Sequence, residues 1–161
     1  MGAEDRYHKM HSISWGKIHQ DCKFLAERLH GTRPWERIVG IARGGLIPSA
    51  IVARELNIKL VDTVCISSYT LRTQGEPNVL KEIHAPDGGD NWLIIDDLVD
   101  TGKTAQVVRS LLPNAYFATV YAKPEGRPFV DVFVTEVSQD TWILFPWDAA
   151  YTYSKPLVED A

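Results

Sequence analysis

The sequence predicts an α/β fold in which a central parallel sheet is covered by helices on both faces. Short, largely apolar runs, too brief for helices, alternate with segments whose apolar residues recur every three or four positions. Strands that read as apolar runs are typical of parallel sheets buried on both faces. The composition agrees, with 45% hydrophobic and 24% charged residues in a chain of 161. That length suits one core, so we expect a single domain over residues 1–161.

The N-terminal quarter is predicted to hold one amphipathic helix. Residues 1–11 are polar and are expected to be a loose lead-in. Ser12 or Ser14 can cap the helix, and Gly31 ends it. Its inward face is predicted from a spacing of three and four residues: Trp15, Ile18, Cys22, Leu25 and Leu29.

A strand, a helix and a second strand are predicted next. The short apolar run 38–41 reads as a buried strand, and the turn Arg43-Gly44-Gly45 follows it. The next helix has Pro48 in its first turn, where its missing N–H costs least. Its buried face is predicted to be Ile51, Val52 and Leu56. Residues 60–69 are β-branched and apolar and predict another strand.

The second half opens on a long polar segment, residues 70–90, which we expect to be a functional loop. A buried strand over 92–95 and a helix between Gly102 and Pro113 follow. The inward residues of that helix are predicted to be Val107, Val108, Leu111 and Leu112.

Three further apolar segments complete the predicted fold. Residues 115–122 predict a strand. Val130, Val132 and Val134 recur with period 2, and residues 142–145 form a short apolar run.

Charge and composition exclude several classes of protein. Lys and Arg total 17 against 21 Asp and Glu, a formal charge of −4, whereas dedicated nucleic-acid binders usually carry a basic excess. No apolar run approaches the roughly 20 residues that a membrane span needs, and the N-terminus lacks a signal-peptide core. Cys22 and Cys65 lie apart among apolar neighbours, as reduced core cysteines of a cytoplasmic protein do.

Candidate functional residues are most concentrated just after the strand 92–95. Asp96 and Asp97 come first there, and the loop 100–104 follows them. Open α/β sheets bind ligands at the carboxyl ends of their strands. Backbone N–H groups, threonine hydroxyls and a helix N-terminus make such a loop a phosphate site. A helix cap with solvated acids is the structural alternative for Asp100. A P-loop would need glycine five residues before Gly102, and Asp97 stands there.

These motifs resemble a known family. Residues 94–102 (IIDDLVDTG) resemble the phosphoribosyl pyrophosphate (PRPP) signature of type I phosphoribosyltransferases. Four more segments are similar to the bacterial xanthine-guanine phosphoribosyltransferases: 61–69 (VDTVCISSY), 122–128 (AKPEGRP), 139–143 (QDTWI) and 146–148 (PWD). The resemblance implies the type I phosphoribosyltransferase fold with a flexible loop at about 70–90. It also implies a small base-binding hood, formed by the C-terminal segment at about 123–161.

The resemblance implies where PRPP and its Mg²⁺ bind. Asp96 and Asp97 would face the ribose hydroxyls and the metal, with Asp97 the metal contact, since Mg²⁺ binds through one or two carboxylates plus phosphate oxygens. Arg43 and Gly44 would hold the pyrophosphate, although Ala42 replaces the serine that the family often has there. The phosphate-binding stretch would comprise Asp96, Asp97, Leu98, Val99, Asp100, Thr101, Gly102, Lys103 and Thr104.

Two positions depart from the family pattern. Lys103 stands where a second small residue is usual, and its ammonium either contacts a phosphate or points to solvent. The arginine that closes the loop over PRPP would align with Gly75, and Arg72 is the nearest basic residue.

The resemblance also implies the base-binding residues. Asp100 would lie beside the purine N7 as the catalytic acid or base. Lys123 would donate to the 6-oxo oxygen and so exclude adenine. Trp142 would stack on the purine, and the Ile143 carbonyl would accept from its 2-substituent.

Two functions are compared. The first is an Mg²⁺-dependent purine salvage enzyme that transfers ribose 5-phosphate from PRPP to guanine, xanthine and, less well, hypoxanthine. The alternative is a regulator with this fold that binds nucleotide and nucleic acid without turnover. The negative charge and the complete base-binding set argue against the regulator.

The resemblance further implies a homotetramer in the cytoplasm, with neither nucleic acid nor an integral membrane segment. The aromatic residues Trp147, Tyr151 and Tyr153 are expected to be exposed, either at an interface or in a solvent-facing tail. Peripheral association with the inner membrane surface is known in the family, but the sequence shows no basic amphipathic helix to support it.

Overall fold

The computed structural model describes residues 6–67, 77–148 and 155–158. Its helices are α1 (Trp15–Leu29), α2 (Leu46–Glu55), α3 (Lys103–Leu111) and a short 3₁₀ turn (Arg127–Phe129). Its strands are β1 (Lys9–Ser12), β2 (Arg37–Ala42), β3 (Val61–Ser67), β4 (Asn78–Lys81), β5 (Trp92–Val99), β6 (Tyr116–Ala122), β7 (Val132–Glu136) and β8 (Thr141–Leu144). In this part of the chain no helix is both long and apolar enough to cross a bilayer.

The main sheet has six strands in the order β4-β3-β2-β5-β6-β7. All neighbours in it are parallel except β4, which runs antiparallel to β3. The predicted parallel sheet is therefore confirmed. Residues 70–90 are not all loop, because β4 lies within them. Gly75 and Arg72 of this segment lie outside the described residues.

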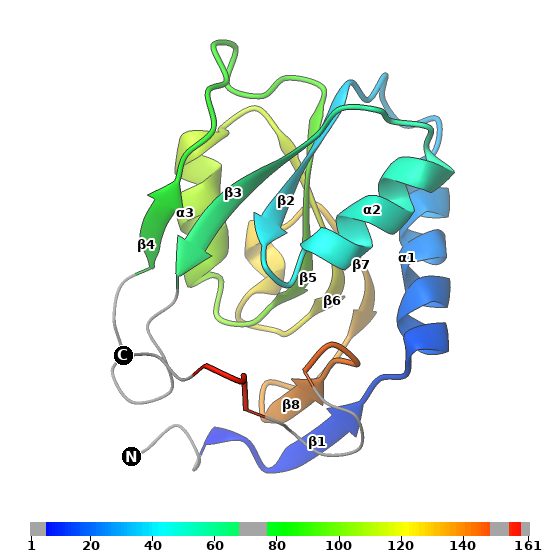
Figure 1. Ribbon diagram of the computed structural model, residues 1–161, viewed down its shortest axis with the longest axis vertical. Helices are drawn as coiled ribbons and strands as arrows, with labels where there is room; N and C mark the ends of the chain where they lie inside the picture. The colour runs from blue at the N-terminus through cyan, green and yellow to red at the C-terminus, as the bar shows by residue number, and fades with distance from the viewer. Residues whose placement is uncertain (1–5, 68–76, 149–154, 159–161) are drawn as a thin grey trace.

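Helices cover both faces of this sheet, as predicted (Figure 1). Side chains alternate along β5, so Leu93 and Ile95 pack with α1 and α2, while Trp92 and Ile94 pack with α3. The inward faces of the helices are narrower than expected. The predicted inward residues that are fully buried are Ile18, Cys22, Leu25, Leu29, Val52, Val108 and Leu112, whereas Ile51, Leu56, Val107 and Leu111 are half-buried.

The amphipathic helix α1 begins and ends by identifiable local chemistry. The Ser14 hydroxyl accepts a hydrogen bond from the Lys17 N–H at 3.1 Å, so Ser14 and not Ser12 is the cap. Gly31 takes the left-handed conformation (φ +73°) just after the helix. Trp15 was predicted to face inward, but it is 54% exposed and contacts Trp147.

The N-terminal segment contradicts the prediction of a loose lead-in. β1 pairs in parallel with β8, from Lys9 opposite Thr141 to Ser12 opposite Leu144. All four β1 residues are exposed and mostly polar, so hydrophobic patterning could not reveal this strand. The hood is thus built from both ends of the chain, and it lies on the side toward which β2 and β3 point (Figure 1).

The predictions for the cysteines and for the C-terminal aromatic residues are confirmed only in part. Both cysteines are free, as expected, but only Cys22 is fully buried and Cys65 is half-buried. Trp147 was expected to be exposed, yet it is half-buried and stacks on Phe145 at 4.7 Å between ring centroids. Tyr151 and Tyr153 lie outside the described residues.

Gly45, at the start of α2, fits tightly between two strands. A Cβ atom there would lie 2.8 Å from the Ile41 carbonyl oxygen, whereas one at Gly16 in α1 would meet nothing closer than 4.0 Å. We predict that Gly45→Ala lowers the free energy of unfolding by about 1–3 kcal/mol through overpacking. The control Gly16→Ala should leave it unchanged or raise it by up to about 1 kcal/mol. Urea unfolding measures both, and equal midpoints would contradict this packing.

Candidate functional site

The site begins where β2 and β5 lie side by side. The chain leaves β2 toward β3 on one side and leaves β5 toward β6 on the other. Such a divergence opens a crevice at the carboxyl ends of the two strands. The loop Arg43-Gly44-Gly45 follows β2 there, across a cis peptide bond between Ala42 and Arg43.

Gly44 brings this loop against the end of β5. A Cβ atom at Gly44 would lie 2.7 Å from the carboxyl carbon of Asp97, too close for any side chain. Arg43 beside it is exposed. The structure therefore brings Gly44 against the acid pair, with Arg43 next to it in the chain.

Asp96 and Asp97 form an acid pair held by backbone hydrogen bonds. The Asp97 N–H donates to Asp96 Oδ1 at 2.9 Å, and the Leu98 N–H donates to Asp97 Oδ1 at 2.7 Å. Burial and the charge of Asp97 raise the pKa of Asp96 well above its usual value. Burial raises the pKa of Asp97 to about 6, and the charge of Asp148 adds to the increase. Asp148 itself has a raised pKa, chiefly through burial.

The raised pKa values of these carboxyl groups are consistent with a site for the implied Mg²⁺. Two partly buried carboxylates, with a third nearby, are ionised at neutral pH only at a cost that a cation would remove. Mg²⁺ usually binds one or two carboxylates and takes its other ligands from water and substrate phosphate. The donor set at Asp97 therefore fits Mg²⁺, although no group of three or more candidate ligands occurs within the described residues.

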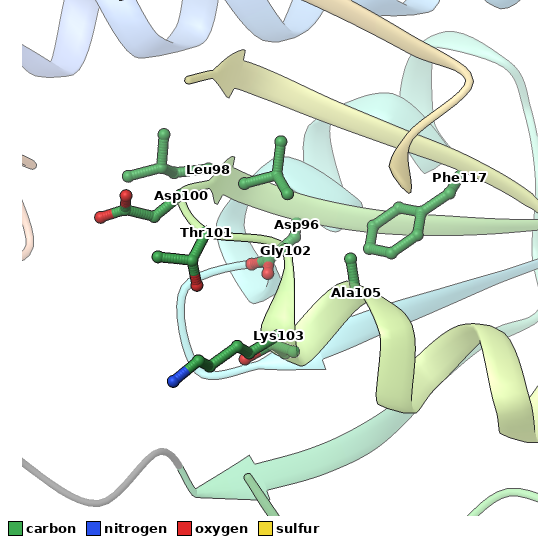
Figure 2. Close-up of a pocket in the computed structure, with 10 residues that line it drawn as sticks. Asp96, Leu98, Asp100, Thr101, Gly102, Lys103, Ala105 and Phe117 are labelled. Carbon is green, nitrogen blue, oxygen red and sulfur yellow. The ribbon is translucent and has the colours of Figure 1, made fainter. Parts of the chain in front are cut away.

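The loop after β5 encloses a small pocket of about 120 Å³ (Figure 2). Gly102 adopts φ +88° and packs against the Phe129 ring, which leaves no room for a side chain. α3 begins at Lys103, so the unpaired N–H groups of its first turn and its positive dipole end lie beside the pocket. The pocket is lined by Asp96, Leu98, Val99, Asp100, Thr101, Gly102, Lys103, Thr104, Ala105 and Phe117. Every residue of the predicted phosphate-binding stretch 96–104 except Asp97 thus lines one pocket, whereas Arg43 and Gly44 do not line it.

Lys103 and Asp100 extend in different directions from this loop (Figure 2). Lys103 is exposed at the edge of the pocket that it helps to line, so both alternatives for its ammonium stay open. Gly102 is the N-cap of α3, and no side-chain hydrogen bond caps this helix. Asp100 is therefore not the helix cap.

Asp100 instead has side-chain partners from three other segments. Its Oδ2 accepts from Lys123 Nζ at 3.0 Å and from the Tyr7 hydroxyl at 2.8 Å. Its Oδ1 accepts from Gln139 Nε2 at 2.7 Å. Lys123 is 1% exposed, so its ammonium needs this carboxylate as a counter-charge.

Trp142 and Ile143 come from β8 in the hood. The Trp142 ring meets the Tyr7 ring edge to face, with 5.1 Å between centroids. The carbonyl groups of Asp140 and Leu144 accept hydrogen bonds from the segment that contains β1. Because carbonyls alternate along a strand, that of Ile143 faces the other edge of β8. This is the orientation that recognition of a ligand by the Ile143 backbone requires.

Sequence reasoning missed Tyr7, Gln139 and Asp148 as site residues. Gln139 and Asp148 lie in segments that carry the family resemblance, and that was the only signal for them. Tyr7 gave none, because its contact with Asp100 spans 93 positions of the chain.

Comparison with known proteins identifies the family. The family model described as a phosphoribosyl transferase domain matches residues 14–154. The chain belongs to the phosphoribosyltransferase family. The xanthine-guanine phosphoribosyltransferase of Nitratidesulfovibrio vulgaris strain DP4 is 57% identical over 159 residues, which cover 98% of this chain and 96% of that one. The protein of that name from Desulfotalea psychrophila is 56% identical, covering 96% of both chains.

A solved structure agrees with the fold of this phosphoribosyltransferase. The crystal structure of the purine phosphoribosyltransferase from Pyrococcus horikoshii Ot3 has a TM-score of 0.71 and 28% sequence identity. The match covers 94% of this chain and 99% of that one.

The raised pKa values of Asp96 and Asp97 predict that the free energy of unfolding depends on pH. A raised carboxyl pKa stabilises the fold below the unfolded value of 3.8, and this contribution is lost as pH rises through about 6. Without a cation, we predict that Asp97→Asn is more stable than the parent protein at pH 7.5 by roughly 1–3 kcal/mol, and no more stable at pH 4.

Thermal unfolding in a chelating buffer at the two pH values measures this difference. Asp90→Asn, at an exposed carboxylate, is the matched control and should change neither value. An Asp97→Asn protein that is destabilised equally at both pH values would contradict the electrostatic account.

Proposed function

We propose that this phosphoribosyltransferase serves purine salvage. It transfers ribose 5-phosphate from PRPP to N9 of guanine or xanthine, and less well of hypoxanthine, giving GMP, XMP or IMP and pyrophosphate. The observation that carries the proposal is the pairing of the buried Lys123 with the half-buried Asp100 near Trp142, adjoining a phosphate-sized pocket at a helix N-terminus. The names of the two relatives reported above support it.

In the phosphate-binding part of the site, backbone N–H groups and the positive end of the α3 dipole would bind the phosphates. The N–H groups and hydroxyls of Thr101 and Thr104, with the start of α3, would hold the 5′-phosphate. The Gly44 loop would hold the pyrophosphate, because a glycine lets backbone N–H groups approach its oxygens closely, and Arg43 would add charge. Both contacts fix the anomeric carbon between leaving group and base.

The acid pair would hold Mg²⁺ through Asp97, with Asp96 beside the ribose hydroxyls. The ion, when bound, would neutralise charge on the departing pyrophosphate. Asp97 is fixed for this by the Leu98 N–H and by the absence of a side chain at Gly44. Water must be kept from the reactive sugar, and the segment at about 70–90 is proposed to close over it.

The base-binding part selects 6-oxopurines. Lys123 would donate to O6, where adenine carries an amine donor instead, so adenine would leave the buried ammonium facing another donor. The Trp142 ring would stack on the purine. The Ile143 carbonyl would accept from the 2-substituent that hypoxanthine lacks, a lost hydrogen bond worth roughly 2- to 13-fold.

Asp100 is proposed as the catalytic residue. Its carboxylate would lie at N7 and hold or exchange a proton there while the bond at N9 forms. The Lys123 ammonium on the same carboxylate links this step to recognition of O6.

The enzyme is further proposed to be one domain, a homotetramer and cytoplasmic, on family resemblance. The net charge of −4 and the base-binding set argue against a nucleic-acid-binding regulator, which needs neither Lys123 nor Trp142.

Turnover tests the proposal directly. Protein, Mg²⁺ and PRPP are mixed with guanine, xanthine, hypoxanthine or adenine, and nucleotide formation is followed. We expect GMP and XMP, IMP more slowly, and no AMP. A chelator should stop the reaction, and excess Mg²⁺ should restore it. Absence of any product would overturn the proposed function in favour of a regulator, and a kcat/KM higher for hypoxanthine than for guanine would contradict the role of Ile143.

Substitution of Asp97 and substitution of Asp100 should change different kinetic constants. Asp97→Asn is predicted to raise the KM for PRPP, with partial rescue by added Mg²⁺, because it acts on binding through the metal. Asp100→Asn is predicted to lower kcat about 10²–10⁴-fold with little change in the KM for PRPP. Steady-state kinetics well below each melting temperature separates them. A destabilised Asp100→Asn protein with near-normal kcat would make Asp100 purely structural.

A further inference from the structure

Tyr7, in the N-terminal segment ahead of β1, contacts the residues that are proposed to bind the base. Its hydroxyl donates to Asp100 Oδ2 at 2.8 Å. The Lys123 ammonium lies 4.5 Å from the centre of its ring, and the Trp142 ring meets it at an interplanar angle of 75°. One side chain thus contacts three residues that the proposed function assigns to the base.

The hydrogen bonds of Tyr7 and Gln139 restrict the orientation of the Asp100 carboxylate. A carboxylate can turn about its last side-chain bond, and donors on both of its oxygens stop that rotation. Tyr7 holds Oδ2, and the Gln139 amide holds Oδ1 at 2.7 Å. Arg6 adds only a long ion pair of 3.9 Å and is itself 42% exposed.

Tyr7 is also suited to donate at every working pH. Burial and the hydrogen bond to Asp100 raise the pKa of its phenol to about 12, so the hydroxyl keeps its proton. The ring face meanwhile offers its negative quadrupole to the Lys123 ammonium. The same residue therefore contacts both members of the Lys123–Asp100 charge pair.

We propose that Tyr7 is a positioning residue for the base site, which with Gln139 fixes the plane of the Asp100 carboxylate and holds Lys123 beneath its ring. This inference rests on the proposed function. It makes the segment ahead of β1 part of the site, since β1 pairs with β8 and β8 carries Trp142. The two ends of the chain then assemble one base-binding wall.

Two substitutions of Tyr7 separate the role of its hydroxyl from that of its ring, and a third substitution elsewhere is the control. Tyr7→Phe removes only the donor to Asp100. Tyr7→Leu also removes the ring that contacts Lys123 and Trp142. Tyr116→Phe is the matched control, because that ring lies at the start of β6 against Trp35 and the Arg33 guanidinium.

Steady-state kinetics with guanine and PRPP, and melting temperatures, are measured for all four proteins. We expect Tyr7→Phe to lower kcat about tenfold, the lower end for loss of a hydrogen bond to a charged group, since Lys123 and Gln139 still hold Asp100. Its KM for PRPP and its melting temperature should match those of Tyr116→Phe. Tyr7→Leu should in addition raise the KM for guanine severalfold.

Failure of the proposed function and failure of the inference about Tyr7 would give different results. A parent protein that makes no nucleotide overturns the proposed function, and this inference with it. An active parent whose Tyr7→Phe variant keeps kcat within twofold overturns the inference alone. So does a variant whose kcat loss comes with a matching loss of PRPP binding and melting temperature, because Tyr7 would then be only a packing residue.

Discussion

The whole site depends on the absence of a side chain at Gly44. Strands β2 and β5 diverge at their carboxyl ends, and the loop after β2 must cross the end of β5 to close the crevice. It does so by packing against the Asp97 carboxyl group, with no room for a Cβ atom. The loop proposed for pyrophosphate, the acid pair and the start of α3 are thereby held at one edge of the sheet. Only that proximity lets one ligand span them.

A second constraint comes from the buried ammonium of Lys123. A charge that is 1% exposed requires a counter-charge, and Asp100 supplies it. Asp100 in turn takes donors from Tyr7 and Gln139, so the loop after β5, the end of β6 and the hood form one network. The β1–β8 pairing holds the hood across the site. In the proposed function, phosphate recognition would thus rest on the backbone, and base recognition would rest on side-chain charge.

Much of this could be predicted from the sequence, because local patterns determine it. The strand β5, its terminal acids and the helix after Gly102 are contiguous, and Ser14 and Gly31 delimit α1 by chain-local chemistry. What could not be predicted depends on contacts between distant residues. β1 is exposed at all four positions and mostly polar, and Tyr7 meets Asp100 across 93 positions. Trp15 satisfies a helical period yet is exposed, because the period alone does not show how wide the buried face is.

The central claim is that one nucleotide spans the pocket before α3 and the Lys123–Asp100 pair. A crystal structure of the protein with GMP tests it most directly. We expect the 5′-phosphate at residues 100–104, O6 within hydrogen-bond distance of Lys123 Nζ, N7 beside Asp100, and the purine against Trp142. A purine bound away from Lys123 and Trp142, or a phosphate held outside this loop, would contradict it.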